Sequence, residues 1–209
     1  MTAEFDGEGA ATALAASDPV LAGVIERVGA CPLAPRPEVD LFEALLRSIV
    51  YQQLHGKAAA AIHGRVVALM AAPNAASLQA VPDASLRAAG LSGNKIRAVR
   101  DLAARALDGS VPTAADAAAL RDEDLIDRLV KVRGIGPWTV QMLMIFYLGR
   151  PDVMPVADFG VRKAFSLLYR RGRPCRPEAI LRHAKRWRPY RSTATWYLWR
   201  SLDTELPGP

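Results

Sequence analysis

A glycine-containing turn and an aspartate further along the chain are the residues best suited to chemistry. Gly134-Ile135-Gly136 separates two predicted helices, so the amide N–H groups that follow it stand at the start of the second helix. Such amides, with no Cβ in the way, suit a phosphate oxygen. Asp158 lies 22 residues after Gly136 and directly precedes another predicted helix. An aspartate there is typical of a helix N-cap, and the same position would hold an ionised carboxylate rigid for catalysis.

Positive charge is concentrated in the second half of the chain. Residues 1–120 carry 10 Lys and Arg against 12 Asp and Glu, whereas residues 121–209 carry 17 against 9, for a net charge of +6. Between positions 162 and 200, twelve basic residues accompany a single acid, Glu178. The asymmetry indicates a polyanion binder, although arginines that are merely solvated would give the same pattern.

The elements that must hold these residues are predicted to be helices. A chain of 209 residues with 51% hydrophobic content can bury a core. No segment alternates apolar and polar residues as a strand would, and Asp40 with Glu43 forms a predicted capping box. We therefore predict an all-α fold, with helices over 20–28, 41–50, 57–70, 83–90, 92–109, 124–131, 138–148, 159–170, 177–187 and 192–202, and a further helix starting at Thr113.

The helices are predicted to form two lobes with an active-site cleft between them. Residues 1–16 are expected to be a disordered acidic tail. Residues 17–54 and 156–209 would form lobe A, and 55–155 lobe B, with a helix-hairpin-helix at 124–148. No apolar stretch approaches the roughly 20 residues of a membrane span, and no signal peptide is visible. We expect a cytoplasmic protein that is not associated with a membrane.

Four segments in order resemble the helix-hairpin-helix DNA glycosylases, most closely the 3-methyladenine DNA glycosylase II branch. They are residues 48–59, 89–95, 125–165 and 189–194, and the resemblance covers roughly residues 18–203. It implies the two-lobed glycosylase fold, excision of alkylated purines and double-stranded DNA with damaged bases as partner. Cys31 and Cys175 alone cannot bind an iron–sulfur cluster, so no cofactor of this kind is expected. We expect a monomer.

The resemblance makes Asp158 the catalytic carboxylate. Breaking an N-glycosidic bond leaves positive charge on the sugar, which a fixed anion stabilises. Asp158 could instead orient or deprotonate the attacking water, and the sequence leaves both roles open. Trp138 stands where strand-cutting members carry a Schiff-base lysine. The chain is therefore predicted to be monofunctional and to leave an abasic site.

The resemblance also implies a pocket for the base. Trp138 would offer a cation–π face to a positively charged alkylated base, unless it merely packs in the core. Tyr190 and Phe159 would line the same pocket. Met142 occupies a position where the enterobacterial type has an aromatic residue, and that protein also carries an extra N-terminal domain. Trp196 and Trp199 are predicted to be core residues.

Several residues are expected to contact the DNA itself. A flipped nucleotide leaves a gap, which Gln53 or Leu54 would fill from the minor groove, with His55 beside it. The residues assigned to the DNA phosphate are Gly134, Ile135, Gly136 and Thr139. The family hairpin often holds Na⁺ or K⁺ on main-chain carbonyls, which would fall at Val130, Val132 and Ile135.

Two alternatives to this function remain open. A non-catalytic helix-hairpin-helix protein could bind distorted DNA by hairpin and charge alone, although backbone binding requires neither Asp158 nor Trp138. The second alternative is a glycosylase for deaminated or oxidised bases. An adenine glycosylase of the usual mismatch type is disfavoured, because such enzymes carry a cluster of four cysteines and this chain has two cysteines.

Overall fold

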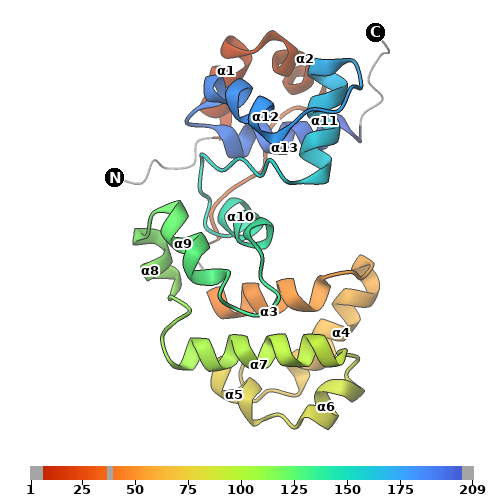
Figure 1. Cartoon of the computed structure of the whole chain (residues 1–209), viewed down its shortest axis with the longest axis vertical. Helices are drawn as coiled ribbons and strands as arrows, with labels where there is room; N and C mark the ends of the chain where they lie inside the picture. Colours follow the sequence, from red (N-terminus) through yellow and green to blue (C-terminus); the bar gives the residue numbers. More distant parts are fainter. Residues whose placement is uncertain (1–6, 37–39, 204–209) are drawn as a thin grey trace. The chain divides into compact units, whose positions relative to one another are not determined.

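The computed structural model describes residues 7–36 and 40–203, and all regular elements in these residues are helices (Figure 1). The all-α prediction is confirmed. Packing divides the chain into two compact units. Residues 1–36 and 144–209 belong to the first unit, and residues 37–143 to the second. None of the helices in the described ranges is long and apolar enough to cross a membrane.

The first unit joins the two ends of the chain around one core. Its elements are α1 (Gly7–Ser17), α2 (Pro19–Val28), α11 (Phe159–Arg170), α12 (Pro177–His183), the 3₁₀ helix η1 (Ala184–Trp187) and α13 (Arg191–Ser201). Helix α13 packs against α1, α2 and α11. Trp187 and Tyr197 are fully buried among aliphatic residues such as Leu21 and Val24. Burial of these large side chains is the main stabilising term of the unit.

The second unit is built around α7 (Gly93–Leu107). The other elements are α3 (Leu41–Tyr51), α4 (Gly56–Ala68), α5 (Ala75–Ala80), α6 (Asp83–Ala88), α8 (Ala114–Ala119), α9 (Asp122–Leu129) and α10 (Pro137–Phe146), which begins in the second unit and ends in the first. Figure 1 shows α7 running beside α3, and α7 also packs against α5 and α6. Leu45, Ile49, Val99 and Leu102 are completely buried in this unit.

The prediction of a disordered tail over residues 1–16 is wrong for residues 7–16. These residues form most of α1, and Leu14 is only 1% exposed. Alanine has the highest intrinsic helix propensity, so the Ala-rich segment forms a helix without a regular apolar period. Ala10 and Leu14, four positions apart, then face the core together. Residues 1–6 lie outside the described residues.

The boundaries of the two units also differ from those of the predicted lobes. The prediction placed residues 17–54 in lobe A and 55–155 in lobe B. Helix α3 instead packs against α4 and α7, so it belongs to the second unit, and the division falls at 36/37 and 143/144. The apolar face of α3 fits either lobe as far as the sequence shows, because a helix periodicity does not identify the partner helix.

Candidate active site

Asp158 is the N-cap of α11, as the sequence predicted. Its Oδ1 accepts a hydrogen bond of 2.8 Å from the backbone N–H of Val161, three residues into the helix. The same oxygen accepts a second hydrogen bond of 2.8 Å from Nε1 of Trp199 on α13. The carboxylate is half-buried, so it is ordered by protein donors while part of its surface meets solvent.

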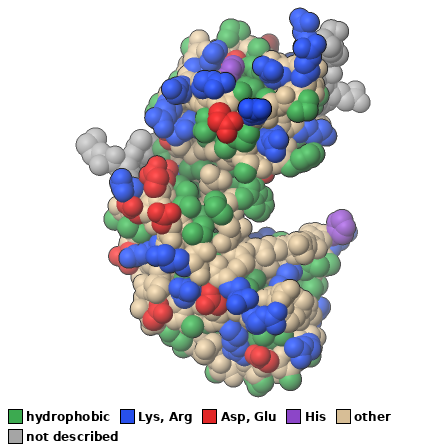
Figure 2. Space-filling model, viewed as in Figure 1, with side chains coloured by type: hydrophobic (Ala, Val, Ile, Leu, Met, Phe, Trp, Pro, Cys, Tyr) green, Lys and Arg blue, Asp and Glu red, His purple; other side chains and the backbone are tan. Residues whose placement is uncertain are grey.

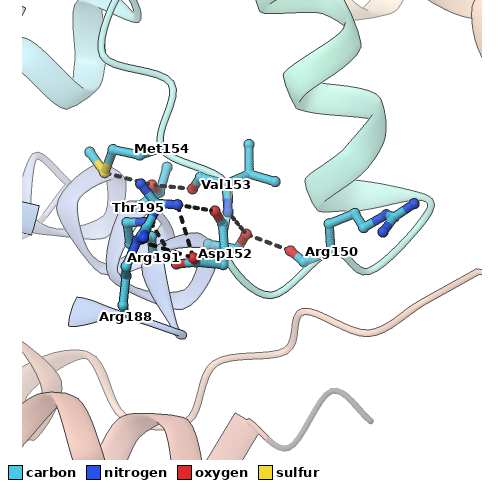
Figure 3. Close-up of polar contacts among 8 residues, drawn as sticks. Arg150, Asp152, Val153, Met154, Arg188, Arg191 and Thr195 are labelled. Carbon is cyan, nitrogen blue, oxygen red and sulfur yellow. Dashed lines mark hydrogen bonds and ion pairs between the residues drawn. The ribbon is translucent and has the colours of Figure 1, made fainter. Parts of the chain in front are cut away.

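The loop that leads to Asp158 is fixed by the start of α13 (Figure 3). Arg191 donates from Nε to Oδ1 of Asp152 at 2.6 Å and from Nη2 to Oδ2 at 2.9 Å. Ser192, which is fully buried, donates its backbone N–H to the carbonyl of Pro151 at 2.9 Å and accepts from the N–H of Val153 at 3.0 Å. A bidentate ion pair and two backbone contacts therefore hold the loop on the helix that also carries Trp199.

Two predicted pocket residues lie in the first unit with Asp158. Phe159 follows Asp158 directly and is 79% exposed. Tyr190, the N-cap of α13, is half-buried and packs against the core of the unit. A large aromatic ring left this exposed next to a capped carboxylate is suited to contact a ligand, because folding alone favours its burial.

The predicted hairpin is present in the second unit. Helix α9 ends before a turn in which Gly134 has a φ of +81°, and α10 begins at Pro137. Ile135 is buried at 5% exposure and donates its N–H to the carbonyl of Val132 at 3.0 Å. The turn is tied to α7, since the N–H of Arg133 donates to Oδ2 of Asp101 at 2.7 Å. The left-handed conformation at Gly134 is the reason for glycine there.

The first turns of α10 carry three further candidate residues. Trp138 is 47% exposed, so it is not a core residue. Met142, one turn later, is half-buried. Thr139 is buried at 7% exposure, unlike the exposed Gly134 of the same proposed phosphate site.

The proposed wedge residues lie in the connection between α3 and α4. Gln53 is exposed and has a φ of +58°, a left-handed conformation that is uncommon outside glycine. Leu54 is 39% exposed and His55 is exposed. All three side chains are at the surface, so none of them is a core residue.

Two residues that no local pattern singled out hold this connection in place. Lys95 donates from Nζ to the carbonyls of Val50 and Gln52 at 2.6 and 2.8 Å. Burial lowers the pKa of this ammonium group. Gln52 donates from Nε2 to the carbonyl of Gly134 at 2.8 Å, which joins the wedge connection to the hairpin. An open groove of about 340 Å³ lies between these elements.

Basic side chains cover much of the first unit. Figure 2 shows Lys and Arg side chains gathered over the part that contains α11 and α12. All the basic residues from position 162 to 188 are exposed. Exposed arginines on one unit are suited to bind phosphates by releasing counterions.

The carbonyls assigned to a monovalent cation are in the hairpin turn. The carbonyl of Val132 accepts a hydrogen bond from the N–H of Ile135, which uses one of its two lone pairs. Neutral carbonyl oxygens suit Na⁺ or K⁺, so the donor set fits the expected ion. A cation held by Val130, Val132 and Ile135 stays a prediction.

A hairpin between two helices, followed by a capped aspartate in an all-α chain, defines a helix-hairpin-helix protein. The model of the HhH-GPD superfamily of base excision DNA repair proteins matches residues 46–189. The chain belongs to this superfamily, and the predicted family is confirmed.

Several glycosylases are similar to this protein over most of the chain. DNA-3-methyladenine glycosylase 1 of Schizosaccharomyces pombe is 37% identical over 163 residues, which are 77% of this chain and 72% of the relative. The solved structure of the 3-methyladenine DNA glycosylase of that organism in complex with abasic DNA has a TM-score of 0.82 at 32% identity and covers 94% of this chain and 98% of its own. A DNA-3-methyladenine glycosidase from Bacillus halodurans has a TM-score of 0.83 at 35% identity and covers 93% and 89%.

Proposed function

We propose that this protein is a monofunctional DNA glycosylase of base excision repair. It hydrolyses the N-glycosidic bond of alkylated purines, of the 3-methyladenine and 7-methylguanine type, in double-stranded DNA and leaves an abasic site. The observation that carries the proposal is the carboxylate of Asp158, which two N–H donors from different helices hold at the start of α11. The similarity to 3-methyladenine DNA glycosylases supports the same substrate class.

The reaction begins with extrusion of the damaged nucleotide from the duplex. The exposed Gln53 or Leu54 fills the space that the nucleotide leaves, and the hairpin amides beside Gly134 bind a backbone phosphate. Lys95 and Gln52 support the wedge because they fix the backbone of the α3–α4 connection. Extrusion costs unstacking energy, which is lowest at damaged base pairs and so contributes to selectivity.

Asp158 acts when the bond between C1′ and the purine nitrogen breaks. The base leaves with the bonding electron pair, and positive charge develops on C1′ and the ring oxygen. The ordered carboxylate stabilises this charge without having to reorganise. Water then adds to C1′ and releases a proton, which Asp158 accepts. An alkylated cationic purine departs as a neutral base, so it needs no proton donor.

The aromatic residues supply recognition of the base. The indole of Trp138 binds a cationic purine through a cation–π interaction of about 0.5–2 kcal/mol. Phe159 and Tyr190 contribute aromatic surface from the first unit, and Met142 contributes apolar surface one turn after Trp138 on α10 of the second unit. Trp138 also fills the position where an attacking lysine would stand, so the enzyme does not cleave the strand. We further propose that it acts as a monomer, because one active site serves one lesion.

The proposal is tested by abasic-site formation on methylated duplex DNA. Wild type is expected to release methylated purines and Asp158→Asn to lose at least 100-fold in rate, about 2.7 kcal/mol. Asp40→Asn is a matched control, because Asp40 is also a helix N-cap and accepts from the N–H groups of Phe42 and Glu43. A wild-type protein that binds duplex DNA tightly and excises nothing would instead support the non-catalytic alternative. A panel of deaminated and oxidised bases tests the other alternative.

A further inference from the structure

The indole of Trp199 is fixed by two contacts. Its Nε1 donates to Oδ1 of Asp158 at 2.8 Å, and its ring stacks on Phe146 with centroids 5.6 Å apart and an interplanar angle of 16°. Trp199 of α13 therefore does more than pack against the core. The stack sets the plane of the ring, and the ring plane sets the direction of the N–H.

Gly160 provides the space for this arrangement. A Cβ at position 160 would lie 2.9 Å from Cδ1 of Trp199 and 3.1 Å from Oδ1 of Asp158. Side-chain atoms do not approach so closely, so any larger residue in this first turn of α11 would push the indole away from the carboxylate. The φ of Gly160 is not positive, so a left-handed backbone conformation does not explain the glycine at this position.

The two donors to Oδ1 have different effects. The N–H of Val161 belongs to the helix that Asp158 caps and holds the oxygen at the start of that helix. This hydrogen bond constrains Oδ1 from one direction. The indole N–H comes from α13 and adds a second direction, which fixes the plane of the group. Small losses of orientation at a catalytic group cost large factors in rate.

We propose that Trp199 is the positioning residue of the catalytic carboxylate, in a pair that requires glycine at position 160. The inference rests on the proposed function, since it concerns how Asp158 meets C1′. The role of Trp199 follows from its contacts with Asp158 and Phe146. It acts through Asp158 and should alter the chemical step while leaving DNA binding intact.

Trp199→Phe tests the donor separately from the ring. Phenylalanine can still stack on Phe146 and lacks the N–H. The single-turnover rate of release of 7-methylguanine is expected to fall about tenfold, which corresponds to about 1.4 kcal/mol. Affinity for a duplex with an abasic-site analogue should stay within about twofold, because binding does not depend on the plane of the carboxylate. Trp196→Phe is the matched control, a half-buried indole on the same helix whose ring contacts Tyr197, and its rate should be unchanged.

Gly160→Ala tests the same hydrogen bond from the other side. The added methyl group displaces the indole, so the single-turnover rate should fall by a similar factor. Gly64→Ala is its control, because a Cβ at this helical position meets nothing within 4 Å. The double variant Trp199→Phe with Gly160→Ala should be no slower than the slower single variant, since both remove one interaction.

The outcomes separate this inference from the proposed function. If wild type is active, Asp158→Asn is inactive and Trp199→Phe excises at the wild-type rate, the positioning role is overturned and the glycosylase activity stands. A Trp199→Phe variant that loses rate, DNA affinity and thermal stability together also overturns it, because that result describes a structural residue. If wild type excises no base at all, the proposed function is wrong, and the positioning role of Trp199 is wrong with it.

Discussion

Asp18 is a buried carboxylate on which much of the first unit depends. It is 2% exposed and accepts five hydrogen bonds. Two come from backbone N–H groups in the first turn of α2, at 3.1 and 3.2 Å. The other three come from side chains on α11, α12 and η1, namely Tyr169 Oη at 3.0 Å, His183 Nε2 at 2.9 Å and Trp187 Nε1 at 2.9 Å.

Asp18→Asn keeps the shape and removes the charge. An asparagine has one oxygen acceptor where aspartate has two. If the amide oxygen takes the place of Oδ2, the two backbone N–H groups lose their acceptor, and if the NH₂ group takes that place, the three side-chain donors lose theirs. Hydrogen bonds to charged groups contribute about 1.5–3 kcal/mol each, and a buried group that loses its partner costs about 1–3 kcal/mol. Because neighbouring contributions do not add, we expect the free energy of unfolding to fall by about 3 kcal/mol.

Urea denaturation followed by circular dichroism at neutral pH measures this loss. Asp40→Asn is the control, since Asp40 is an exposed N-cap that accepts hydrogen bonds from the backbone N–H groups of Phe42 and Glu43. Asparagine caps a helix about as well as aspartate, so the control should lose less than about 0.5 kcal/mol. The difference between the two variants isolates the side-chain network.

The acid limb gives an independent check. Burial raises the pKa of Asp18, but hydrogen bonds from His183, Trp187, the Leu21 amide and Tyr169 outweigh burial, so the folded pKa lies below the ordinary 3.8. A lowered folded pKa stabilises the protein above the unfolded value and the contribution is lost as pH falls through the folded pKa. The advantage of wild type over Asp18→Asn should be full above about pH 5 and shrink below about pH 4. An Asp18→Asn protein within 1 kcal/mol of Asp40→Asn, or an advantage that does not change with acid, would refute the reasoning.

Three further predictions concern single side chains. Trp138→Ala should slow excision of cationic bases about tenfold and leave affinity for an abasic-site analogue unchanged, as measured by single-turnover release and fluorescence anisotropy, whereas equal losses would indicate a structural tryptophan. Lys95→Met removes the donor to the carbonyls of Val50 and Gln52, so it should weaken capture of a flipped nucleotide several-fold, as reported by a fluorescent base analogue, and an unchanged signal would exclude support of the wedge. Burial, and after it the charge of Asp18, raises the pKa of Tyr169 above its ordinary 10. The contribution of neutral Tyr169 to the stability of the fold is therefore complete below about pH 10 and is lost as the pH rises further. Tyr169→Phe should reduce this alkaline loss of stability in a series of thermal denaturations.

The sequence predicted those parts of the fold that local chemistry determines. Ser92 and Thr113 were expected to start helices, and their hydroxyl oxygens accept from the N–H groups of Lys95 and Asp116. Asp158 and the hairpin at Gly134 were recognised for the same reason. A helix cap or a glycine turn involves residues within three or four positions, so its pattern is visible along the chain.

The remaining features depend on contacts between distant positions. Trp199 meets Asp158 across 41 positions, and Lys95 reaches the end of α3 across 45. No periodicity predicts which helix lies opposite such a side chain. Trp199 does pack against the core, as predicted, but its hydrogen bond to Asp158 is not visible in the sequence, and the prediction places α3 in the wrong unit. The one local signal was Gly160, a glycine in the first turn of a helix, where Gly is disfavoured without a packing reason.

Helix α11 is secured near both of its ends, by Trp199 at Asp158 and by Asp18 at Tyr169. The second anchor is the N-cap of α2, close to the beginning of the described chain. Trimming the chain back to position 19 would therefore remove an acceptor that the far end of the catalytic helix requires. Loss of activity in such a shortened protein would reflect a misaligned helix rather than a missing substrate contact.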